Sequence, residues 1–124
     1  MTRRPSATAL AVVGLGGAAG AVLRWVLVEL VPDGGGFPWT TFAVNVSGCL
    51  AIGFLPLLTR RPLLTTALGP GLLGGYTTMS AYAEQSRALL ADGHGGTALA
   101  YLVGTLIACL GAVVLADRLA GDET

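Results

Sequence analysis

The chain has 124 residues and no formal net charge; 53% of the residues are apolar, a further 19 are glycine and only 11% are charged. This balance is too apolar for a water-soluble domain of this size and predicts a protein embedded in lipid. The basic residues are all arginines scattered along the chain, which argues against a nucleic-acid partner. The two cysteines lie in separate apolar runs, which indicates neither a disulfide framework nor a zinc site.

Four apolar stretches are long enough to cross a membrane as helices, because a hydrocarbon core of about 30 Å requires about 20 helical residues. We predict these helices at residues 7–30, 37–59, 62–90 and 97–118. The connections at 31–36 and 91–96 are rich in glycine, which is typical of helix breaks. The sequence therefore predicts an all-α membrane protein in which residues 1–124 form one membrane domain with four transmembrane helices.

The first stretch has two further interpretations. Two arginines precede it, as in a secretory signal peptide, and Gly14, Gly16 and Ala19 fit the dinucleotide fingerprint G-x-G-x-x-G/A. That fingerprint requires a preceding strand, whereas another membrane-length apolar run follows here. In lipid, Gly16 and Gly20 instead form a G-x-x-x-G face that allows two helices to approach closely.

The third stretch contains two adjacent glycines, Gly74 and Gly75, followed by Thr77 and Thr78. Glycine and β-branched residues both lower helix propensity, so a break near the middle of this helix is one interpretation. Broken backbone at membrane depth is tolerated where it lines a cavity, and its carbonyls can then bind a hard cation. The other interpretation is an unbroken helix in which the glycines form a packing notch.

Three segments together resemble the motifs of the Fluc (CrcB) fluoride channels. These segments are Gly16–Trp25 in the first stretch, Thr40–Gly48 in the second and Gly74–Ser80 in the third, and their order and spacing also agree. The resemblance covers nearly the whole chain. It implies a passive, fluoride-specific channel of the plasma membrane that exports fluoride and relieves its toxicity.

The resemblance also implies an assembly. Two subunits in opposite orientations would form an antiparallel, dual-topology dimer, with the broken third helices meeting at its centre. A structural sodium ion would lie there, bound by the backbone carbonyls of Gly74 and Thr77 and not transported. Sodium is a hard cation that prefers oxygen ligands, so converging carbonyls are suitable.

By the same resemblance, a set of polar and aromatic residues would line the fluoride pathway: Asn45, Thr78, Met79, Ser80, Tyr82, Tyr101, Thr105 and Cys109. Asn45 offers two amide donors without a charge, although an asparagine can also join helices by a hydrogen bond. Tyr101, Thr105 and Cys109 share one helical face, which without the resemblance is equally typical of packing.

The chain departs from the family pattern at several of these positions. Met79 stands where the family has the first of two phenylalanines, whereas Tyr82 keeps a ring at the second. Cys109 stands where serine is more usual and is a weaker donor. Glu84 is one position before the family's glutamate, which aligns with Gln85, so no role is carried over to Glu84.

Arg24 matches an arginine of the family and is the first charge in its stretch. It is either a structural residue that extends to the membrane interface or part of a vestibule. A small multidrug-resistance-type transporter and a non-transporting assembly protein are the alternative functions. The first would require a deep carboxylate, but Glu29 lies near the end of its stretch. An enzyme is not expected, because His94 stands alone in a glycine-rich connection.

The partner is either a second copy of this chain or a homologous chain of opposite orientation. With four crossings, both termini and the connection at residues 60–61 share one side. That side carries five arginines, namely Arg3, Arg4, Arg60, Arg61 and Arg118, against Arg24 and Arg87 on the other side. This bias favours a cytoplasmic N-terminus and would suit a heterodimer, but a homodimer can tolerate a modest bias.

Overall fold

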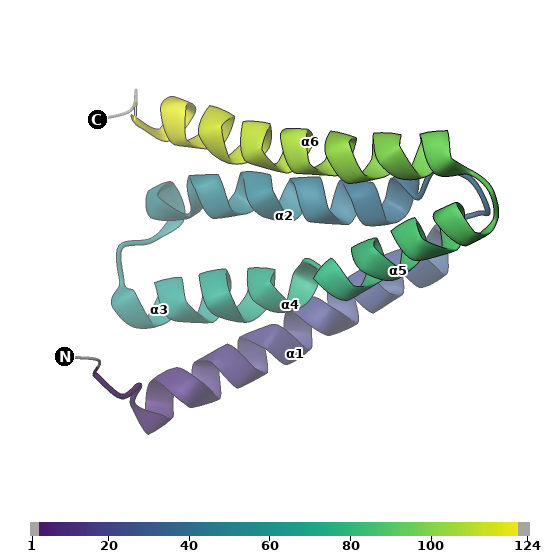
Figure 1. Cartoon of the computed structure of the whole chain (residues 1–124). Coiled ribbons are helices and arrows are strands. Elements are labelled where there is room, and N and C mark those ends of the chain that lie inside the picture. Colours follow the sequence, from purple (N-terminus) through teal and green to yellow (C-terminus); the bar gives the residue numbers. More distant parts are fainter. Residues whose placement is uncertain (1–2, 122–124) are drawn as a thin grey trace.

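The computed structural model describes residues 3–121, and all regular structure within that range is helical (Figure 1). The three long helices are α1 (Ala7–Leu30), α2 (Trp39–Leu58) and α6 (Gly95–Gly121). Each is long and apolar enough to cross a membrane, judged by length and composition. The predicted all-helical class is therefore confirmed, and the outermost residues of the predicted domain, 1–2 and 122–124, lie outside the described range.

The third predicted helix is divided into shorter pieces. These are α3 (Pro62–Thr66), the π-helix η1 (Ala67–Leu73), α4 (Gly74–Tyr76) and α5 (Met79–Ala91). Pro70 lies inside η1 and cannot donate a backbone hydrogen bond, which favours a departure from regular α-helical pairing. The π-helix is a feature that the sequence interpretation missed.

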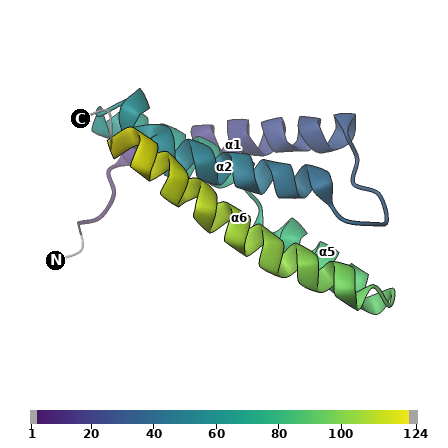
Figure 2. The same ribbon diagram turned by 90° about the horizontal axis from the view of Figure 1, so that it is seen from above.

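The connections lie at two opposite ends of the molecule. Figure 1 shows both chain ends and the α2–α3 connection at one end, and the α1–α2 and α5–α6 connections at the other. Helices α2 and α6 run alongside each other in the view of Figure 1, whereas Figure 2 shows that they diverge toward the end where α6 meets α5. This arrangement matches a chain that crosses a membrane four times and returns to its starting side.

Helix α1 packs closely against the third stretch through its glycines. A Cβ atom at Gly16 would overlap the carbonyl oxygen of Ala67, and one at Gly20 would overlap that of Leu72 and lie 2.7 Å from the nitrogen of Tyr76. Only glycine allows backbone to approach backbone this closely. The predicted close-approach face of Gly16 and Gly20 is confirmed.

Helices α2 and α6 bury one face each against the rest of the chain. The buried positions on α2 are Thr41, Val44, Asn45, Gly48 and Leu55, and those on α6 include Ala98, Tyr101, Thr105 and Ala116. Many large apolar side chains instead point outward, for example Leu15, Ile107 and Leu110. An apolar exterior of this extent suits contact with lipid or with another chain.

Candidate functional site

The site is built around an interruption between α4 and α5. Thr77 and Thr78 have extended backbone there, with φ of −76° and −142° and ψ of 156° and 120°. Asn45 of α2 holds this segment with both ends of its amide. Its Nδ2 donates to the Thr78 carbonyl at 3.1 Å, and its Oδ1 accepts from the Thr78 N–H at 2.8 Å.

Three further side chains bond to backbone groups around the interruption. The Thr78 hydroxyl caps α5 by accepting from the N–H of Ala81 at 3.1 Å. The Thr77 hydroxyl donates to the carbonyl of Leu73 at 3.0 Å, and the guanidinium of Arg24 donates through Nε to the carbonyl of Gly75 at 3.4 Å. Arg24 therefore contacts the interrupted segment directly.

The two carbonyls predicted as sodium ligands are among those that lose their helical donors at this point. In a continuous helix, the N–H groups of Thr78 and Ala81 would donate four residues back, to the carbonyls of Gly74 and Thr77. Here the Thr78 N–H donates to Asn45 and the Ala81 N–H donates to Thr78 Oγ1. The carbonyl oxygens of Gly74 and Thr77 are thereby released from regular helical pairing.

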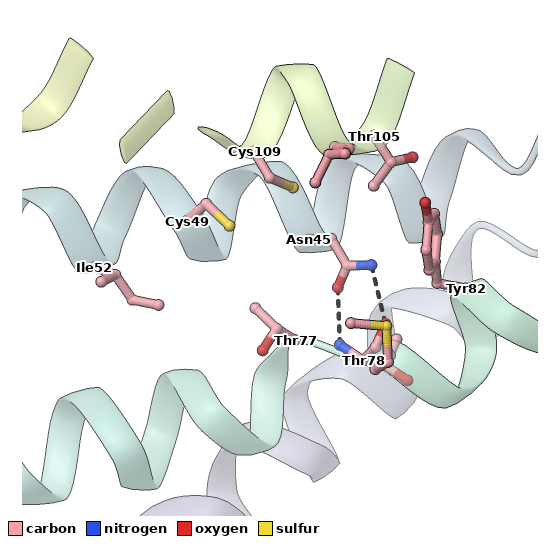
Figure 3. Close-up of a pocket in the computed structure, with 10 residues that line it drawn as sticks. Asn45, Cys49, Ile52, Thr77, Thr78, Tyr82, Thr105 and Cys109 are labelled. Carbon is pink, nitrogen blue, oxygen red and sulfur yellow. Dashed lines mark hydrogen bonds between the residues drawn. The ribbon is translucent and has the colours of Figure 1, made fainter. Parts of the chain in front are cut away.

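A cavity of about 260 Å³ lies beside the interruption, between α2, α5 and α6 (Figure 3). None of its ten lining residues is charged. They are Asn45, Cys49, Ile52, Thr77, Thr78, Met79, Tyr82, Thr105, Leu106 and Cys109. Six of the eight residues predicted for the fluoride pathway are in this set.

The hydroxyl of Thr105 is the unusual polar group of this cavity. Thr105 is only 5% exposed, and its Oγ1 has no hydrogen-bond partner within the described residues. A buried hydroxyl without a partner is unfavourable, and this one belongs to a residue that lines the cavity. Asn45, 7% exposed, also keeps one of its two amide N–H donors beyond the hydrogen bond to Thr78.

Two residues predicted for the pathway lie outside the cavity lining. Tyr101 is fully buried, and its hydroxyl donates to Gln85 Oε1 at 2.7 Å. Ser80 is exposed, with its hydroxyl 3.3 Å from that of Thr78. Tyr82 does line the cavity, but its hydroxyl donates to the carbonyl of Leu102 at 2.7 Å, so its ring is what the cavity meets.

Met79 and Glu84 show the effect of the departures noted in the sequence. Met79 is 76% exposed at the edge of the cavity, so a flexible thioether occupies the place of a ring there. Glu84 pairs with Arg87 on the exposed surface of α5, at 2.6 Å. Glu84 is thus part of an exposed ion pair and does not line the cavity.

A hydrogen-bonded cluster around Asp33 was not predicted from the sequence. Asp33, in the α1–α2 connection, accepts from the N–H groups of Thr40 and Thr41 at 2.8 and 3.3 Å and from the Thr41 hydroxyl at 2.5 Å. It also accepts from Gln85 Nε2 at 3.0 Å, and Gln85 in turn accepts from Tyr101. The sequence feature that could have indicated this cluster is an aspartate before the Thr40-Thr41 pair at the start of α2. Asp33 lies too far before the helix, however, to be an ordinary N-cap residue.

A smaller cavity of about 160 Å³ lies between this cluster and the interruption. Its polar lining consists of Arg24, Thr41, Thr78 and Gln85. Arg24 therefore donates a hydrogen bond to the Gly75 carbonyl and also lines this cavity. Both interpretations of Arg24 from the sequence remain compatible with this position.

The fold and the site define a small multi-pass membrane protein with an uncharged cavity at an interrupted helix. Residues 11–116 match the family described as CrcB-like protein, Camphor Resistance (CrcB), and the chain belongs to this family.

Several curated relatives are similar over most of their length. Fluoride-specific ion channel FluC 1 of Streptomyces coelicolor is 50% identical over 119 residues, which cover 91% of this chain and 77% of the relative. FluC 2 of Nocardia farcinica is 46% identical, covering 86% and 80%, and FluC 2 of Streptomyces avermitilis is 48% identical, covering 81% and 67%. The predicted family is confirmed. The relatives named here are ion channels, and ion channels are not enzymes.

Proposed function

We propose that this chain conducts fluoride passively out of the cell across the plasma membrane and so relieves fluoride toxicity. The observation that carries the proposal is the uncharged cavity in which the buried Thr105 hydroxyl has no partner among the described residues. The choice of ion is supported by the curated relatives, which are named fluoride-specific ion channels.

The cavity has the chemistry that a small anion requires. An anion that leaves water must find hydrogen-bond donors, because an unpaired charge in an apolar interior is very unfavourable. Thr105 and Asn45 can each offer a neutral donor, and neutral donors bind weakly enough to release the ion again. A full positive charge is absent from the lining, so the ion would not be trapped.

We place the interruption at Thr77 and Thr78 inside the membrane, in the middle of the third crossing. The first, second and fourth crossings would be α1, α2 and α6, which are long and apolar enough. Residues 62–91 would form the remaining crossing, and its irregular backbone is supported by Asn45 and Arg24, which bond to backbone groups of Thr78 and Gly75.

A structural sodium ion would fit at this interruption. The carbonyls of Gly74 and Thr77, predicted as its ligands, are among those that lose their helical donors at the interruption. No group of three or more His, Cys, Asp or Glu residues could hold a metal in the described part of the chain, so a cation here would depend on carbonyl oxygens. Gly74 is exposed on the single chain, where a second chain could add the remaining ligands.

The partner would be a chain in the opposite orientation. A homodimer and a heterodimer with a homologous chain are both compatible with the exposed apolar exterior. The bias of five arginines to two favours one orientation for this chain and therefore the heterodimer, although the bias is modest.

Proteoliposomes loaded with equal fluoride and chloride test the function. Fluoride exit, followed with an ion-selective electrode, should greatly exceed chloride exit, and it should begin only when a potassium ionophore balances the charge. Equal exit of both anions would contradict fluoride selectivity. Exit that needs no charge balance would contradict a passive channel and favour an exchanger.

A further inference from the structure

Two cysteine side chains meet in the cavity that we assign to fluoride. Cys49 belongs to α2 and Cys109 to α6; both are free, half-buried and part of the cavity lining. Figure 3 shows both thiols turned into the same space between these helices. The chain thus carries a thiol pair on facing helices and not two isolated cysteines.

The pair lies next to the polar part of the cavity. Cys49 follows Asn45 by four residues on α2, and Cys109 follows Thr105 by four residues on α6. Residues four apart lie on the same face of a helix, so the thiol pair is one helical turn away from the polar pair of Asn45 and Thr105. A group bound between the thiols would therefore occupy the cavity beside the donors of the site.

The strong soft ligands of this cavity are the two thiols, and the only other sulfur in its lining is the Met79 thioether, which cannot be deprotonated. No other cavity residue is a histidine, carboxylate or cysteine, and the described residues contain no cluster of three such groups. A tetrahedral zinc site needs four ligands, so zinc is a poor match. Two thiolates suit a soft cation that accepts two ligands.

We propose that Cys49 and Cys109 form a two-coordinate binding site for the mercuric ion, Hg²⁺, inside the cavity. Each thiol loses one proton and forms one sulfur–mercury bond, so one Hg²⁺ and two thiols give a neutral bis-thiolate and two released protons. No oxidant is needed, because the oxidation state of mercury and sulfur does not change.

The neutrality of this product decides which soft cation fits best. Silver(I) or copper(I) with two thiolates would leave one negative charge in an uncharged cavity within the membrane, which is strongly unfavourable. Hg²⁺ leaves none. Mercuric chloride is itself an uncharged molecule and can reach a cavity bordered by the exposed Met79.

The binding itself does not depend on the proposed function, whereas its effect on transport does. A metal bridge between α2 and α6 fills part of a cavity of about 260 Å³ and fixes the two helices together. If fluoride uses this cavity, mercuric chloride blocks its passage.

The first experiment measures binding to the purified full chain in detergent. Mercuric chloride should consume both thiols at one metal per chain, detected by thiol titration, intact mass and the sulfur-to-mercury charge-transfer absorption. Cys49→Ser and Cys109→Ser should each bind at least about 100-fold more weakly, since the second thiolate must then come from another molecule. Cys49→Ala and Cys109→Ala repeat the comparison with a different side chain.

Two mercury ions per chain, each on one thiol, would overturn the proposal, as would a single-cysteine variant that binds as tightly as the original chain. In liposomes, each variant is compared with its own untreated fluoride flux. Mercuric chloride should stop flux only where both cysteines are present, and an added dithiol should restore it. If the untreated chain passes no fluoride, the proposed function fails, and the binding result still stands or falls on the metal stoichiometry.

Discussion

Asn45 of α2 holds the backbone of Thr78, between α4 and α5, in its extended conformation. Its amide pairs with both backbone groups of Thr78, as a neighbouring strand would, and this leaves one amide N–H. The structural and functional interpretations of this asparagine are therefore compatible: one N–H and the oxygen hold the interruption, and the other N–H is not used by that contact.

Replacing Asn45 with aspartate should abolish fluoride flux. A carboxylate cannot donate to the Thr78 carbonyl, which is unfavourable by roughly 1–3 kcal/mol, and it places a negative charge beside an anion path. Fluoride efflux and thermal unfolding of the same sample separate the two effects. Unchanged flux in this variant would remove Asn45 from the pathway.

Replacing Thr105 with valine should raise the stability of the chain and lower its fluoride flux. Thr105→Val keeps the shape but deletes a buried hydroxyl that has no partner among the described residues, so the chain should become more stable by up to about 1 kcal/mol. Fluoride flux should fall by at least about tenfold, as expected from the loss of roughly 1.4 kcal/mol of stabilisation of the passing ion.

Thr105→Ser is the matched control, because it keeps the hydroxyl. It should retain most of the fluoride flux measured for the original chain. If Thr105→Val conducts as well as Thr105→Ser, the unpaired hydroxyl has no part in conduction.

At the scale of the helices, the interruption depends on backbone more than on side chains. Thr77 has φ of −76°, which proline can adopt, so proline would not strain this angle. Proline would instead remove the hydrogen bond that the Thr77 N–H donates to the carbonyl of Leu73 at 3.0 Å. It would also disfavour the helical conformation of the preceding Tyr76.

Thr77→Ala should therefore be tolerated better than Thr77→Pro. Alanine loses one hydroxyl hydrogen bond to Leu73, worth about 1 kcal/mol, but keeps the N–H and the carbonyl. Proline loses the N–H and disturbs α4. Fluoride flux with thermal unfolding provides the comparison, and equal losses would show that the Thr77 side chain is the essential part.

The packing of α1 can be tested with two glycines of the same helix. Gly20→Ala should destabilise the chain by roughly 1–3 kcal/mol, because its Cβ would overlap the Leu72 backbone, which cannot rotate away. A Cβ atom at Gly14 would have no atom of another described element within 4 Å, so Gly14→Ala should be neutral or stabilising by up to about 1 kcal/mol. Thermal unfolding in detergent measures both, and equal effects would contradict the packing role of Gly20.

The long helices were predictable because length and apolarity alone determine them. Helix α1 occupies the predicted range, and α2 and α6 lie within a few residues of theirs. The π-helix around Pro70 and the cluster of Asp33, Thr41 and Gln85 were not predictable in this way. The cluster depends on contacts between segments far apart in the chain, which periodicity and propensity do not encode, and a proline in a helical run does not by itself specify a π-helix.

At the scale of the whole molecule, the polar cluster and the glycine contacts join the crossings at different points. Asp33 and Gln85 connect the α1–α2 connection to α5, while Tyr101 extends the cluster to α6. Gly16 and Gly20 join α1 to η1 and α4. All of these contacts lie within one chain.

Expressing this chain alone with a reporter at its C-terminus tests the orientation. The arginine bias predicts a reporter that faces mainly the cytoplasm, and little fluoride flux from the single gene product if an opposite partner is required. Comparable populations facing both compartments, together with fluoride flux, would exclude the heterodimer and support a dual-topology homodimer.

The Asp33 carboxylate shows how much coordination this chain gives to an anionic group that it holds permanently. Four donors surround it, two backbone N–H groups, one hydroxyl and one amide, and all four are neutral. The cavity at the interruption offers a passing ion the Thr105 hydroxyl and one Asn45 N–H. A fluoride ion there would be only about half as well coordinated by one chain, so it would keep part of its hydration shell wherever the second chain does not supply the missing donors.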